Sequence, residues 1–149
     1  MSLYTRTRLR AAKQAGAITL FVTEQWDHTN QFASPEVKGA YLLNLGGSFV
    51  QLTHMTVWPQ RNDKLRTDIL QPALLSPGER LDVLDHAWFQ HLEDLRANHI
   101  SVPEFPRSER VGLTVEFHVV TPEGPSMLAI VVLVKHSETG PALSLPDDQ

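Results

Sequence analysis

The stretch Val111-Gly-Leu-Thr-Val-Glu-Phe-His-Val-Val120, followed by Met127-Leu-Ala-Ile-Val-Val-Leu-Val134, decides the fold class. In the first part every second residue is apolar, and this period of two is typical of a half-buried β-strand. The second part is apolar on both faces and rich in β-branched residues, which indicates a strand covered on both sides. Proline and glycine between the two parts favour a turn. The sequence therefore predicts a hairpin over residues 111–120 and 126–135, in a mostly-β domain with a substantial core.

The composition is that of an ordinary globular domain. The chain has 149 residues, of which 42% are hydrophobic and 20% charged, so we expect one domain whose core needs no disulfide or metal for stability. A net charge of −4 disfavours a nucleic-acid partner. The absence of cysteine excludes disulfides, thiolate metal sites and cysteine nucleophiles. No apolar run reaches the roughly 18 residues that a membrane span needs.

Five further strands are predicted by alternating apolar residues, at 17–24, 37–45, 49–58, 68–75 and 80–84. In the second of these, Tyr41, Leu43 and Leu45 are predicted to lie on one face. In the third, the alternation changes parity, and a β-bulge near Thr53-His54 would restore one apolar face. Pro72 indicates that its strand lies at an edge of the sheet. Gly46-Gly47 is interpreted as a hairpin turn, because glycine adopts the positive φ that such turns need.

Two helices are predicted beside these strands. Good helix formers around the closely spaced Arg6, Arg8 and Arg10 indicate a short exposed helix that ends near Gly16. A helical stripe through Trp88 and its apolar neighbours predicts a helix over residues 85–98. The expected domain organisation is a basic N-terminal helix or arm at 1–15, a β-sandwich at 16–136 and a flexible tail at 137–149. The cytoplasm is slightly favoured, while an envelope location and an anchor preceding the basic segment are left open.

Two segments add a resemblance to a known family. They are Leu43-Asn-Leu-Gly-Gly-Ser-Phe-Val-Gln-Leu52, with an Asn-x-Gly turn, and Leu74-Leu-Ser-Pro-Gly-Glu-Arg-Leu-Asp-Val83, with a Pro-Gly-Glu turn. Together they resemble the immunoglobulin-like accessory domains of bacteria, including the cell-adhesion-related type. The resemblance implies an antiparallel immunoglobulin-like β-sandwich of about seven strands, here with one inserted helix and a short N-terminal helix. It implies no catalytic residue.

The chain carries no recognisable catalytic or cofactor motif. The nucleophile elbow Gly-x-Ser-x-Gly and the glycine-rich phosphate loops do not occur. Of the seven histidines, His86 and His91 are five residues apart and diverge on a helix. His118 lies beside Glu116 on the solvent face of its strand, where it could meet another histidine across strands. Scattered surface histidines are nevertheless the commoner arrangement, so we predict neither a catalytic residue nor a metal or other cofactor.

The candidate ligand- or partner-binding residues are Trp26, Trp88, Phe89 and His91. Trp26 stands at a strand end, where tryptophan can bind a partner or a sugar, although a lid over the core is the commoner role. The leading hypothesis is a non-enzymatic interaction or assembly module that binds a protein partner or itself through an edge strand, near Pro72 or at 17–24, or through end loops. The alternatives are a small-molecule or carbohydrate binder, with a cleft between the sheet and helix 85–98, and a metal-dependent enzyme with a His/carboxylate site.

Overall fold

The computed structural model describes residues 6–26, 35–60, 63–69, 72–84, 91, 111–137 and 140–146. In these residues the secondary structure is almost entirely β, and among them no helix is long and apolar enough to cross a membrane. The elements are β1 (Arg6–Ala15), β2 (Ile18–Trp26), β3 (Glu36–Asn44), β4 (Val50–Pro59), η3 (Asp63–Leu65), β5 (Thr67–Ile69), β6 (Ala73–Leu75), β7 (Arg80–Asp82), β8 (Val111–Thr121), β9 (Gly124–Ser137) and β10 (Gly140–Ser144).

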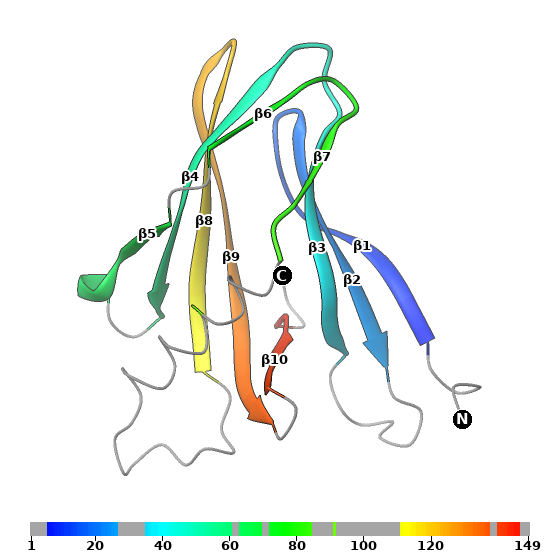
Figure 1. Cartoon of the computed structure of the whole chain (residues 1–149), viewed down its shortest axis with the longest axis vertical. Helices are drawn as coiled ribbons and strands as arrows, with labels where there is room; N and C mark the ends of the chain where they lie inside the picture. Colours follow the sequence, from blue (N-terminus) through cyan, green and yellow to red (C-terminus); the bar gives the residue numbers. More distant parts are fainter. Residues whose placement is uncertain are drawn as a thin grey trace.

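The strands form two antiparallel sheets (Figure 1). The four-stranded sheet has the order β1-β2-β3-β7, and the six-stranded sheet has the order β10-β9-β8-β4-β5, with β6 also paired to β4. Figure 1 shows β1 and β5 at the two outer sides of the molecule. Among the described strands, the chain passes from one sheet to the other three times, between β3 and β4, between β6 and β7, and between β7 and β8.

The hairpin predicted from the C-terminal half is confirmed and forms the centre of the six-stranded sheet. Strand β8 pairs with β9 from Val111 opposite Val134 to Thr121 opposite Gly124. The alternation in β8 buries Leu113, Val115 and Phe117 against the other sheet, while Glu116 and His118 lie on the opposite face, partly buried. Fully burying such side chains contributes about 1.5–3 kcal/mol each.

The predicted bulge in β4 is also present. The register between β4 and β8 shifts between Leu52 and His54. As a result Val50, Leu52, Met55 and Val57 are all buried in the same core, because one extra residue returns the apolar positions to one face. The sequence pattern had located this irregularity to within a residue.

The predicted N-terminal helix is wrong, because residues 6–15 form strand β1. Arg6, Arg8 and Arg10 alternate with uncharged residues. This spacing of two places all three on one face of a strand. Pairing with β2 then brings Arg8 and Arg10 to the buried carboxylate of Glu24. That contact outweighs the helix propensity of the segment.

The predicted flexible tail is wrong for residues 140–144, which form β10 against β9. Leu143 and Leu145 are buried in the core between the sheets. Their burial explains why this part of the chain is ordered despite its prolines and glycine.

Tyr41, Leu43 and Leu45 alternate with buried residues, as predicted for one face of a strand, but this face is not the core face of β3. Val37, Leu42 and Asn44 are buried, whereas Leu45 is exposed. The register of β3 on β2 shifts so that Lys38 is passed over, and the opposite face is apolar as well, because Tyr41 stacks on Phe21 of β2 at 5.5 Å between ring centroids. Two apolar faces leave the parity of the strand undetermined by its sequence.

The helix predicted over residues 85–98 lies outside the described residues except for His91, which is helical and half-buried. The cleft predicted between that helix and the sheet therefore also lies outside them. All observed strand pairs are antiparallel, as the short connections predict.

Candidate functional site: the turn end of the sandwich

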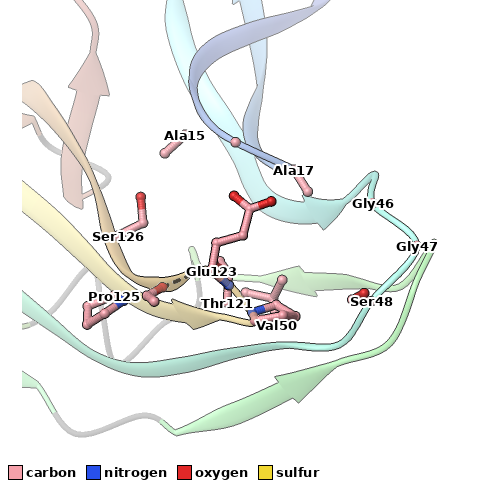
Figure 2. A pocket seen from close by; sticks show the side chains of 13 residues that line it. Ala15, Ala17, Gly46, Gly47, Ser48, Val50, Thr121, Glu123, Pro125 and Ser126 are labelled. Atoms are coloured by element: carbon pink, nitrogen blue, oxygen red, sulfur yellow. Dashed lines mark hydrogen bonds between the residues drawn. The ribbon is translucent and has the colours of Figure 1, made fainter.

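Three connections meet at one end of the sandwich, which we call the turn end: the β1–β2 turn, the β3–β4 connection and the β8–β9 turn (Figures 1 and 2). Gly16 opens the first turn with φ at 59°, and Ala15 pairs with Ile18 across it. A glycine with positive φ at the first position of a two-residue turn matches the twist of the flanking strands. Pro122 and Glu123 form the third turn between Thr121 and Gly124.

Gly46-Gly47 is not a hairpin turn, because β3 and β4 belong to different sheets. Neither glycine has a positive φ. Instead, Gly46 permits a close approach: a Cβ at this position would lie 2.6 Å from Cβ of Ala17 in the β1–β2 turn. The glycine therefore brings two connections together.

Asn44 joins the two sheets at this end by hydrogen bonds, and it is fully buried. Its Nδ2 donates to the carbonyl oxygens of Ser48, at 2.8 Å, and Leu75, at 3.0 Å. Its Oδ1 accepts from the backbone N–H of Gly46 at 3.0 Å. The backbone of Asn44 in turn pairs with Gly78 and Glu79. The Asn-x-Gly and Pro-Gly-Glu turns, which lie far apart in the sequence, are thus in direct contact.

A cleft of about 580 Å³ opens between these connections (Figure 2), within the 300–1,000 Å³ range that is usual for ligand pockets. Most of its lining side chains are small, so the turns do not fill the space between the sheets. Glu123 is the only ionisable residue among those that line it. Figure 2 shows its carboxylate projecting from the β8–β9 turn toward the β1–β2 turn.

Large exposed apolar side chains gather around the same end. Six such side chains are exposed in the described residues, and five of them are at or next to the turn end. Exposure ranges from 41% for Val120 to 63% for Leu74. The register places Leu74 and Val120 on either side of Gln51 on the outer face of the six-stranded sheet. The five residues, which we call the apolar rim, are Leu45, Phe49, Leu74, Val120 and Met127.

A polar cluster lies next to the apolar rim on that outer face. The rings of His54 and His118 stack with centroids 4.3 Å apart and planes inclined by 10°. Nε2 of His118 lies 3.2 Å from Oε1 of Glu116 and 3.2 Å from the Thr56 hydroxyl. That hydroxyl donates to Oδ1 of Asp68 at 2.9 Å. The Thr56 hydroxyl already donates its hydrogen to Asp68, and the Glu116 carboxylate can only accept. Nε2 of His118 is therefore the nitrogen that carries a hydrogen and donates it.

The side chains of the polar cluster form hydrogen bonds with one another. None of them lines the turn-end cleft, so their placement does not indicate a particular reaction. In the described residues, no group of three histidine, aspartate or glutamate side chains is placed to hold a metal ion. Sequence analysis had identified the His118–Glu116 pair, but the partner His54 depends on the register shift in β4.

Trp26 lies at the other end of β2, away from the turn end. The guanidinium groups of Arg6 and Arg8 lie over its ring, 5.2 and 4.8 Å from the centroid. Trp88 and Phe89 are outside the described residues, and His91 is described without its neighbours. The structure therefore does not bring the four predicted binding residues together.

Sequence analysis did not single out the residues of the apolar rim. Leu74 lies in β6 opposite Gln51, on the exposed face of the six-stranded sheet. Leu45 and Phe49 lie between β3 and β4, outside both strands, and are also exposed. Their exposure depends on how the chain passes from one sheet to the other, which the local apolar pattern does not specify.

The predicted edge strands agree in part with the topology. The segment around Pro72 lies between β5 and β6 at an edge of the six-stranded sheet, as predicted. Residues 17–24 do not form an edge, because β2 lies between β1 and β3.

No protein-family model matches the chain, and no curated protein matches it. Among solved structures, the chain is similar to the crystal structure of a protein from Archaeoglobus fulgidus, with a TM-score of 0.36, 9% sequence identity and 97% of each chain covered. A similarity at this TM-score supports no conclusion about function.

Proposed function

We propose that the protein is a non-enzymatic interaction module that binds a protein partner through the turn end. The observation that carries this proposal is the concentration of exposed large apolar side chains at that end. Leu74 and Val120 flank Gln51 on one face of the six-stranded sheet, and exposed apolar patches on soluble proteins often mark interaction sites. Aromatic and methionine side chains, here Phe49 and Met127, are typical of the centres of protein interfaces.

The surroundings of the apolar rim support a protein partner. Gln51, His54 and His118 border the rim on the outer face of the six-stranded sheet. They place polar groups next to its apolar side chains. The adjacent cleft adds a concave surface with one carboxylate, from Glu123. An apolar patch bordered by polar groups is the usual composition of an interface.

We also propose that the two-sheet fold is a variant of the immunoglobulin-like sandwich. Support comes from the two turn motifs of that resemblance, which contact each other through Asn44. A structural role of this kind explains why both motifs occur in one chain, and it implies no activity.

Site-specific photo-cross-linking tests the interaction proposal. A photoreactive amino acid is placed at Phe49, and at Lys135 as a control, because Lys135 is also exposed but lies toward the end of β9 that is opposite the turn end. In cells that express the protein, we expect a discrete cross-linked protein from position 49 only. The captured protein is then purified, and its binding is measured with wild type and with the Phe49→Ser/Leu74→Ser variant.

A loss of binding of at least tenfold in that variant, with the Lys135→Ser control unchanged, supports the proposal. Equal cross-linking from both positions contradicts it, as does a partner whose binding ignores the double substitution. Light scattering of the purified protein over a concentration range shows whether the partner is a second copy of the chain.

A further inference from the structure

Strand β1 is one edge of the four-stranded sheet in the described part of the chain, and it is strongly basic. Among the described strands, β1 pairs with β2 alone. Alternate backbone N–H and C=O groups along an edge strand point away from the sheet and can pair with another chain. The strand sequence RTRLRAAKQA contains four cationic residues and no acidic one, in a chain whose net charge is −4.

The cations share one face of this edge. Residues opposite one another in a sheet have side chains on the same face. Arg8 is opposite Glu24, and Arg10 is opposite Val22, so the arginines at positions 6, 8 and 10 share one face. Beyond the register shift at Ala12, Lys13 is opposite the buried Leu20 and returns to that face.

One carboxylate faces these cations in the register. The Glu24 side chain is only 2% exposed and accepts from Arg8 at 2.9 Å, with Nε of Arg10 at 3.0 Å. Among the described residues Arg6 has no carboxylate partner, and its guanidinium lies over the Trp26 ring. Arg8 remains 51% exposed despite its ion pair. The edge thus holds its arginines in place and still presents positive charge to solvent.

We propose that the β1 edge binds an extended acidic protein segment, which adds as a further strand to the four-stranded sheet. Backbone hydrogen bonds to residues 6–11 provide the attachment, and alternate Asp or Glu side chains of the segment lie against Arg6, Arg8 and Arg10. A strand and the edge share the same side-chain period of two. The bulge at Ala12 ends the regular edge, so pairing stops before Lys13.

A peptide fits this surface better than a nucleic acid. The unpaired N–H and C=O groups alternate along the edge and match a polypeptide backbone, whereas a phosphate backbone offers acceptors only. Charged edge strands also prevent aggregation, and that role by itself predicts no binding.

The test measures binding of fluorescein-labelled octapeptides to the full chain by anisotropy. The probes are an alternating Glu-Thr peptide, its Gln-Thr analogue, the Glu-Thr peptide with alternate backbone nitrogens methylated, and a single-stranded oligonucleotide of equal charge. We expect the Glu-Thr peptide to bind at least tenfold more tightly than the other three. Amide hydrogen exchange of residues 6–11 is expected to slow in its presence.

Two variants of equal charge locate the site. Arg6→Glu is expected to weaken peptide binding at least tenfold, whereas Lys13→Glu, beyond the bulge, is expected to weaken it less than threefold. Arg6→Gln serves in place of Arg6→Glu if circular dichroism shows that the latter is unfolded. The Phe49→Ser/Leu74→Ser variant is expected to bind the peptide normally, because the turn end is a separate surface.

Four outcomes overturn the proposal. They are no binding of the Glu-Thr peptide, equal binding of the methylated peptide, tighter binding of the oligonucleotide, and equal effects of the two charge reversals. If the Glu-Thr peptide does not bind, the charges of β1 serve to prevent aggregation. If the oligonucleotide binds more tightly, the edge binds nucleic acid.

Discussion

Replacing Asn44 by leucine removes the polar side chain that joins the two sheets at the turn end. Asn44→Leu keeps the number and branching of the side-chain heavy atoms, although its methyl groups are bulkier than the amide, and it removes every side-chain hydrogen bond. Three are lost: those from Nδ2 to the carbonyls of Ser48 and Leu75, and the one that Oδ1 accepts from Gly46.

The cost follows from the surroundings of each lost bond. The bond to Leu75 is buried, while the other two are partly buried. A buried carbonyl left without a donor costs about 1–3 kcal/mol, and each partly buried bond is worth about 1 kcal/mol. We therefore expect the free energy of unfolding to fall by about 3–5 kcal/mol, a large fraction of the roughly 5–15 kcal/mol that stabilises a typical domain.

Urea denaturation followed by circular dichroism measures this change. The m-value should stay constant if the denatured state is unaffected. Gln14→Leu is the matched control, because its side-chain amide also donates to a turn carbonyl at this end, that of Gly16 at 3.0 Å, but in an exposed position. We expect it to cost less than about 1 kcal/mol, since water replaces an exposed partner. If Asn44→Leu lowers the free energy of unfolding by no more than Gln14→Leu does, the buried hydrogen bonds of Asn44 do not have the stabilising role given to them.

Three further outcomes are expected from urea denaturation of single variants. Gly46→Ala should lower the free energy of unfolding by about 1–3 kcal/mol, because the new Cβ meets the β1–β2 turn. Gly47→Ala places a Cβ with nothing within 4 Å and should leave the free energy of unfolding close to that of wild type. Equal losses in the two variants would contradict a close approach at Gly46. Phe117→Ala should cost about 3–5 kcal/mol, because the side chain is fully buried, and a loss below about 1 kcal/mol would disprove its place in the core. Glu24→Gln should cost about 1–3 kcal/mol, because the variant leaves two arginines without their buried carboxylate, while Glu36→Gln breaks a surface pair with Lys38 and should change stability by less than about 1 kcal/mol; similar effects of the two would argue against a structural role for the buried pair.

Most of the β structure follows from local patterns in the amino-acid sequence. In β8 and β9, β-branched and apolar residues recur with the period of a strand, and a proline-glycine turn separates them. The bulge in β4 was also readable, because the change of parity between Leu52 and Met55 requires one extra residue. These features are local, and the physical chemistry of a few neighbouring residues is enough to specify them.

Contacts between distant parts of the chain settle which faces are buried and which strands are neighbours. Arg6, Arg8 and Arg10 form a strand because Glu24, fourteen or more residues away, supplies a buried carboxylate at the matching register. Leu45 and Leu74 look like core residues in the sequence and are exposed in the fold. The turn end likewise exists only because Gly46 and Asn44 bring together three connections from different sheets. Such contacts join residues far apart in the chain, and no local pattern encodes them.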